Sequence, residues 1–327
     1  MSNKRLFSLD IARAFAMVWI VGFWHAADYS PAFSKFLKDY NISSQLTATM
    51  LGTFMFISAY LLASRNTFTT MTDITNYFKK RVVRIIPLLA LSMLCFPNSA
   101  FPFWDFLTKF LNLIGIAGYI SLKLVPTLWF VSILISFYIL LPFIATQKNL
   151  IWKILISIIL EVIFYIGSEF HFIENRIPLY FPAFALGIIL ADVRIKILEK
   201  RNVFFLTSIF FSIIYIILMF IPFLQKTNYV GAFIGFFPFI AVAMNLETFE
   251  SNKLFVKTTK FLSYSSLVAY MFHRQVYIAF YHIGFPQDGI YRLILIFLVI
   301  LPVLFSFSYI IQSFYDKLIT YCSNKIK

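Results

Sequence analysis

Runs of about 20 predominantly apolar residues recur along the whole sequence, and a helix of that length crosses the hydrocarbon core of a bilayer. Hydrophobic residues make up 61% of the 327 residues and charged residues only 13%, about half the charged share of an ordinary soluble domain. The sequence therefore predicts an all-α integral membrane protein, multi-pass in the cell membrane. It is expected to form a single domain over residues 1–327.

About ten transmembrane helices are predicted from these runs. A shorter apolar segment, residues 106–120, carries Lys109 and Asn112 and is expected to be a re-entrant or interfacial piece. Counting it as a span would reverse the orientation of every later helix. The predicted spans cover residues 7–27, 43–64, 82–97, 126–146, 150–168, 176–193, 203–224, 229–247, 261–281 and 290–314.

The distribution of Lys and Arg predicts the orientation. With a cytoplasmic N-terminus, the cytoplasmic segments hold most of the 28 Lys and Arg residues, and the C-terminus is also cytoplasmic. The net charge of +14 then reflects topology, and no nucleic-acid partner is expected. Cys95 and Cys322 lack the spacing of metal ligands, so no metal is expected either. The cations left on the outer side are Lys35, Lys38, Lys109, Lys123, Arg176, Lys226 and Arg292.

Ionisable residues inside membrane spans are costly, so each is a candidate for a functional site. Asp10 and Arg13 are three residues apart and share one helix face, as a structural ion pair or as part of a site. Glu161 is expected to neutralise one of the arginines. The ionisable residues inside the predicted spans are Asp10, Arg13, His25, Glu161, His273 and Arg274.

His25 lies 15 residues after Asp10, roughly 22 Å along an α-helix and so near the outer end of the first span. One interpretation is an interfacial aromatic side chain beside Phe23 and Trp24. The other is a general base, because imidazole titrates near neutral pH and accepts a proton from a hydroxyl group. Asp28, three residues further on, would orient such a base.

The segment YFKKRVVRIIP, residues 77–87, concentrates positive charge on the predicted cytoplasmic side. Arg81 and Arg84 share one helix face, with Lys80 close by. This pattern indicates either a topology signal or a site for an anionic phosphate group, which guanidinium groups bind in bidentate fashion. The sequence contains no Gly-rich phosphate loop, HExxH or GxSxG motif, so nucleotide hydrolysis, zinc hydrolysis and a nucleophile elbow are unsupported.

Six sequence blocks, in order, resemble a known family. They are RLFSLDIARAFAMVWIVGFWH (5–25), FMFISAYLLASR (54–65), FKKRVVRIIP (78–87), LWFVSILISFYILLP (128–142), FPAFALGIILA (181–191) and SYSSLVAYMFH (263–273). They are similar to the conserved blocks of acyltransferase family 3, the membrane acyltransferases that include O-acetyltransferases of bacterial surface polysaccharides. The resemblance covers essentially the whole chain.

The resemblance implies transfer of an acyl group, with acetyl-CoA or another acyl-CoA as cytoplasmic donor, to an acceptor at or beyond the outer face. A polysaccharide or lipid-linked sugar is the expected acceptor. His25 would be the catalytic base, with Arg13 as its partner in the first helix and Asp10 at the inner end of the same path. The other residues that it assigns are Arg81, Arg84 and Lys80 at the CoA phosphates, and Ser58, Trp129 and His273 along the path or site.

The sequence departs from the family pattern in three places. Ala14 stands where the family has Gly after the Arg, and Ala59–Tyr60 replaces Gly-Phe. Eleven residues, not ten, separate Arg13 from His25, and at about 100° per residue this leaves the two side chains roughly 120° apart. Either a π-bulge between Ala14 and Trp24 absorbs the extra residue, or Arg13 and His25 act on different faces.

Two other functions are open at this stage. A polytopic exporter of a glycan or of an acylated intermediate would use the same polar track as a translocation route. A purely structural scaffold is disfavoured, because it gives no reason to bury Arg13, His25, His273 and Arg274. The acceptor, the acyl chain length and the oligomeric state are not specified by the sequence.

Overall fold

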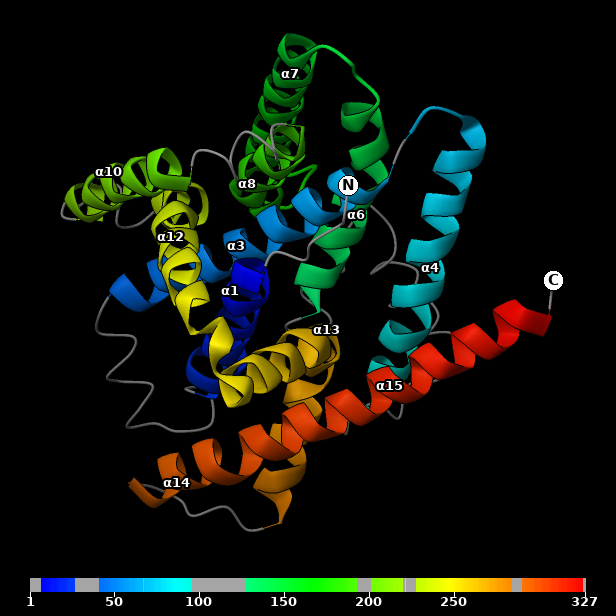
Figure 1. Cartoon of the computed structure of the whole chain (residues 1–327), viewed down its shortest axis with the longest axis vertical. Coiled ribbons are helices and arrows are strands. Elements are labelled where there is room, and N and C mark those ends of the chain that lie inside the picture. The colour runs from blue at the N-terminus through cyan, green and yellow to red at the C-terminus, as the bar shows by residue number, and fades with distance from the viewer. Residues whose placement is uncertain are drawn as a thin grey trace.

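The computed structural model describes residues 7–26, 41–66, 68–95, 128–192, 201–219, 221, 228–283 and 290–325, and over these ranges the regular structure is entirely helical. Figure 1 shows the arrangement of the helices. The helices are α1 (Phe7–Met17), η1 (Val18–Trp24), α3 (Asn41–Arg65), α4 (Met71–Leu94), α6 (Trp129–Ala145), α7 (Leu150–Glu169), α8 (Arg176–Ala191), α10 (Arg201–Met219), η4 (Val230–Ile234), α12 (Phe236–Leu246), η5 (Glu247–Ser251), α13 (Lys253–His282), α14 (Ile290–Leu295), η6 (Ile296–Ile300) and α15 (Leu301–Lys325).

Helical segments overlie each of the predicted spans, and residues 106–120 lie outside the part that the structure describes. Five helical stretches among the described residues are long and apolar enough to cross a membrane. The number of spans and the orientation of the termini stay predictions. The five stretches are Phe7–Trp24, Ser43–Arg65, Leu150–Glu169, Gly231–Ser251 and Tyr291–Cys322.

The boundaries of α4 differ from the predicted span 82–97, because α4 already begins at Met71. Thr70 accepts a hydrogen bond from the Asp73 backbone N–H, and the Asp73 carboxylate accepts one from the Thr70 backbone. This capping box fixes the start of the helix well before the apolar run. The Thr70 backbone N–H also holds the pKa of Asp73 below its usual value. The basic segment 77–87 is therefore regular helix.

Helix α3 packs closely against α8 and η4 because glycines stand where the backbones meet (Figure 1). A Cβ atom on Gly187 of α8 would lie 2.5 Å from the Phe56 carbonyl oxygen and 2.9 Å from the Ala59 Cβ. One on Gly52 would lie 2.2 Å from the Ala232 carbonyl oxygen. Small residues allow such approach in membrane bundles. Ala59, which departs from the family glycine, thus faces a glycine on the partner helix.

Helix α13 runs parallel to α1. The Ser263 hydroxyl, in the first half of α13, donates to Asp10 Oδ1 of α1 at 2.8 Å, and the Tyr277 hydroxyl, nearer the end of α13, donates to the Val21 carbonyl of η1 at 3.0 Å. Helix α15 runs alongside α13 in the opposite direction and reaches α4, where the Tyr315 hydroxyl contacts the Val83 carbonyl (Figure 1).

These contacts define two ends of the bundle. The basic end carries Asp10, Tyr264 and the exposed cations of α4, because Tyr264 donates to Asp316 of α15 and the adjacent Tyr315 contacts the Val83 carbonyl of α4. The histidine end carries His25 and His273. Because α1 and α13 each extend from one end to the other, both present polar side chains at both ends.

Candidate active site

The first helix changes its geometry between Arg13 and His25. Residues Val18–Trp24 form a π-helix, and the His25 backbone N–H donates to the Ile20 carbonyl, five residues back, at 3.0 Å. Of the two alternatives that the extra residue between Arg13 and His25 left open, the structure shows the π-bulge. Wide turns of this kind are rare and often mark functional sites.

The π-helix also changes where His25 points. A π turn advances by roughly 80° per residue, against about 100° in an α-helix, because its hydrogen bonds span five residues instead of four. Five α steps from Arg13 and seven π steps return His25 to within about 20° of the face that carries Arg13. The extra residue is therefore absorbed, and the shared face is restored.

Tyr277 contacts the π-helix directly. Its hydroxyl donates to the Val21 carbonyl, in the middle of the wide turn, and its side chain is almost fully buried. On the other flank, Trp19 Nε1 donates to Thr47 Oγ1 of α3 at 3.1 Å. The backbone before His25 is thus held to both α13 and α3.

His25 and His273 lie against each other. Their ring centroids are 4.5 Å apart, with the ring planes inclined by 34°. His273 is 0% exposed, and its Nδ1 lies 2.6 Å from the Tyr270 carbonyl oxygen. A carbonyl only accepts, so Nδ1 carries the proton. His273 Nε2 has no hydrogen-bond partner among the residues that the structure describes.

A row of aromatic rings lies between Arg13 and the histidines. The Arg13 guanidinium lies 5.9 Å from the centre of the Phe54 ring, and Phe54 lies edge to face with Phe130, 6.1 Å away. Phe130 contacts Tyr270 at 5.2 Å, and Tyr270 contacts His273 at 5.6 Å. The three rings come from α3, α6 and α13, so the row joins three helices between Arg13 of α1 and the histidines.

Trp129 lies beside this row and contacts Arg176, a residue that no sequence motif marked as part of a site. The Arg176 guanidinium lies 4.4 Å from the centre of the Trp129 ring, and Tyr180 stacks on that ring at 6.0 Å. Trp129 meets Phe130 of the row edge to face, with the ring centres 5.9 Å apart. The only sequence signal for Arg176 was its place among the few outer cations.

Asp10 lies at the basic end, as predicted. It is buried and accepts the Ser263 hydrogen bond described above. Its predicted ion pair with Arg13 stays a prediction. Glu161 is different, because one of its carboxylate oxygens is buried without a hydrogen-bond partner in the described part of the chain. The expectation that it neutralises an arginine finds no support among those residues.

The cations of α4 are arranged in two layers. Lys80 and Arg84 are exposed, whereas Arg81 is half-buried and lies 5.9 Å from the centre of the Tyr77 ring. Tyr77 is fixed in turn, because its hydroxyl donates to the Tyr138 carbonyl at 3.1 Å. The exposed pair is four residues apart on one helix face and is accessible to an anionic ligand.

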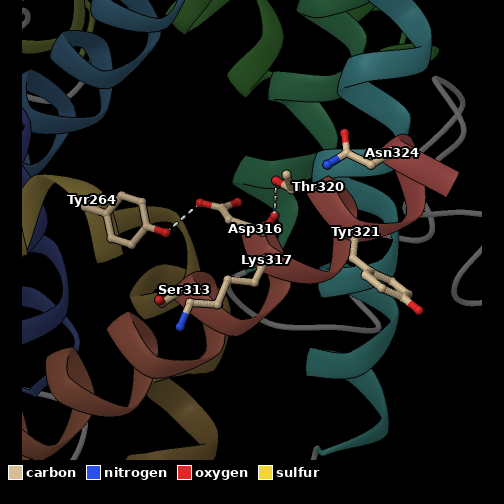
Figure 2. Close-up of a pocket in the computed structure, with 7 residues that line it drawn as sticks. All are labelled: Tyr264, Ser313, Asp316, Lys317, Thr320, Tyr321 and Asn324. Atoms are coloured by element: carbon tan, nitrogen blue, oxygen red, sulfur yellow. Dashed lines mark hydrogen bonds between the residues drawn. The ribbon is translucent and has the colours of Figure 1, made fainter. Parts of the chain in front are cut away.

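An open groove of about 510 Å³ lies at the same end, between α13 and the C-terminal half of α15. Figure 2 shows the Tyr264 hydroxyl pointing to Asp316, to which it donates at 2.5 Å. Gln312 donates to the other carboxylate oxygen at 2.8 Å. The residues that line the groove are Tyr264, Ser313, Asp316, Lys317, Thr320, Tyr321 and Asn324.

The structure therefore brings together His25 and His273, and connects them to Arg13 and Trp129 through aromatic contacts. Arg81, Arg84 and Lys80 lie on α4, away from this cluster. Ser58 is buried on α3 and shares no hydrogen bond with either histidine among the described residues.

A model of a known protein family, described as an acyltransferase domain, matches residues 6–312, which is nearly the whole chain. No curated protein and no solved structure matches the chain. The matched range includes both ends of the bundle, with every helix from α1 to the middle of α15.

Proposed function

The chain belongs to the acyltransferase family whose domain model it matches, and on that premise we propose that it is a membrane O-acyltransferase. The acyl group, which we take to be acetyl, passes from cytoplasmic acyl-CoA to a hydroxyl of a cell-surface or lipid-linked glycan. The proposed topology has ten spans in the cell membrane, with both termini in the cytoplasm. The bilayer, the CoA thioester and the carbohydrate are then its partners.

His25 is the proposed general base. As the acceptor hydroxyl oxygen attacks the thioester carbonyl carbon, His25 takes the hydroxyl proton. The new ester C–O bond forms, the C–S bond breaks, and the CoA thiolate leaves with the proton that His25 returns. His273 accepts no proton in this scheme. Its neutral ring faces His25 and stabilises the imidazolium that forms there.

The basic end is the proposed donor site. Lys80 and Arg84 are exposed and bind the phosphates of CoA, and the half-buried Arg81 adds positive charge behind them. Arg13, on the face that leads to His25, assists the transfer from within the bundle. A single path along α1 thus connects donor and base.

The observation that carries this proposal is the contact between His25 and His273. Two imidazole rings 4.5 Å apart, one of them wholly buried and fixed by a backbone carbonyl, are a costly arrangement inside a membrane helix bundle. Packing alone gives no reason for it. Acid–base chemistry at a hydroxyl group does.

The test compares the wild-type protein with His25→Ala in lipid nanodiscs, with labelled acetyl-CoA and extracted surface glycans. Loss of a general base lowers the rate by about 10²–10⁴-fold. A His25→Ala protein that inserts normally and transfers at the wild-type rate would contradict the proposal.

A separate measurement addresses the exporter alternative. CoA that binds the folded protein raises its midpoint of thermal unfolding. We expect such a shift for both wild type and His25→Ala, since His25 lies away from the donor site. If CoA neither binds nor changes the midpoint, the exporter function replaces the transferase.

A further inference from the structure

Arg176 belongs to the minority of cations that the predicted topology places on the outer side. The predicted topology keeps most Lys and Arg on the cytoplasmic side, and Arg176 lies at the histidine end, in contact with Trp129. Membrane insertion works against a cation in this place, so the topology does not explain it. Its side chain is 43% exposed, and so it is accessible from outside the bundle.

The guanidinium of Arg176 lies against an aromatic ring and a carboxylate. Its central carbon lies over the Trp129 ring, 4.4 Å from the ring centre, and Trp129 also stacks with Tyr180. Glu174 contacts only one edge, with its Oε1 3.5 Å from Arg176 Nε. A guanidinium group presents its N–H donors as a planar fork that matches a carboxylate or a phosphate group.

Arg176 is also connected to the site of chemistry. Trp129, on which it lies, contacts Phe130 at 5.9 Å, and Phe130 contacts Tyr270 at 5.2 Å. Tyr270 contacts His273, and His273 contacts His25. A ligand that placed an acidic group on Arg176 would extend past Trp129 toward His25, and the cation selects the charge of that ligand.

We infer that the acceptor is an anionic glycan and that Arg176 selects it by binding a carboxylate or a phosphate group near the hydroxyl that is acylated. This inference rests on the proposed transferase function and adds the charge of the acceptor to it. Arg176 is a specificity-determining residue, and Trp129 is the platform on which it is held.

The experiment uses membranes that contain the full-length protein, with labelled acetyl-CoA. Glycans and lipid-linked glycans are extracted and separated on an anion-exchange resin, and label that depends on His25 is counted in each fraction. We expect the label in the retained, anionic fraction. Label mainly in the unretained, neutral fraction would overturn the inference and leave the transferase intact. If no fraction contained label that depends on His25, the proposed transferase function itself would be contradicted.

Variants of Arg176 separate charge from packing. Arg176→Met keeps a long side chain over Trp129, and Arg176→Lys keeps the charge. We expect the label in the anionic fraction to fall at least about tenfold in Arg176→Met, the loss of one charge-assisted contact, and to recover partly in Arg176→Lys. Lys226→Gln, which removes another predicted outer cation, serves as the control and keeps the wild-type label. Equal activity of Arg176→Met and wild type would overturn the inference.

Chemical treatment of the retained fraction distinguishes the two acidic groups. Amidation with a carbodiimide and a neutral amine removes carboxylate charge, and cold aqueous hydrogen fluoride cleaves phosphodiesters. The treatment that moves the label to the unretained fraction identifies the group that Arg176 binds. Label that stays retained after both treatments would contradict a carboxylate or phosphate at this position.

Discussion

At the histidine end the polar side chains are buried and touch one another, whereas at the basic end the cations of α4 face outward. His273 is wholly buried against His25, while Lys80 and Arg84 are exposed. The difference fits two tasks. Proton transfer needs groups held in place and shielded from water, and capture of a large polar donor needs groups that solvent and donor can reach.

The largest expected effect on kcat tests whether His25 and His273 act together in catalysis. In His273→Asn, the amide N–H can keep the hydrogen bond to the Tyr270 carbonyl, but no ring nitrogen is left beside His25. We expect kcat to fall about 100-fold, at the lower end of the range for acid–base groups, with little change in the midpoint of thermal unfolding. An unchanged kcat would mean that His273 only fills space.

At the basic end we expect a smaller effect, on the KM for acyl-CoA and not on kcat. The double variant Lys80→Gln/Arg84→Gln should raise the KM for acyl-CoA about tenfold, because exposed charges are partly screened by solvent, and leave kcat unchanged. Added salt should raise the wild-type KM in the same direction. Lys257→Gln, an exposed cation at the start of α13, is the matched control. If this double variant instead lowered kcat and kept a normal KM, the cations of α4 would belong to the catalytic step, and the separation of the two ends by task would be wrong.

The smallest effect compares one tyrosine at each end. Tyr277→Phe removes the hydrogen bond to the Val21 carbonyl in the π-helix, and Tyr264→Phe removes the one to Asp316. Each loss is worth about 1 kcal/mol. We expect kcat to fall about fivefold in Tyr277→Phe, because His25 is less well positioned, and to stay unchanged in Tyr264→Phe at saturating donor. Equal effects of the two variants would argue against a positioning role for Tyr277.

Much of the first helix was predictable because its constraints are local. The position of His25 relative to Arg13 depends only on the residues between them, so a one-residue change in spacing was enough to indicate a π-bulge as one of two alternatives. The structure shows a π-helix at Val18–Trp24. Apolar length likewise located the helices. The early start of α4 was missed because a capping box at Thr70, and not hydrophobicity, determines it.

Contacts between distant segments were not predictable from spacing. Tyr277 reaches Val21 across more than 250 residues of sequence, and Arg176 meets Trp129 because α6 and α8 pack together. The block that contains His273 lies in a predicted helix that the structure shows as α13. The sequence does not indicate which face of α13 packs against α1. Tertiary packing of α1, α6, α8 and α13 decides which polar residues form the site.

The central claim is that donor and base occupy opposite ends of one path. The most direct measurement uses sealed vesicles in which the basic end faces outward, with labelled acetyl-CoA outside and extracted surface glycans both outside and trapped inside. CoA thioesters do not cross the bilayer unaided, since they are highly charged. We predict labelled glycan in the lumen with the wild-type protein and none with His25→Ala. Label confined to glycans on the same side as the donor would contradict the account.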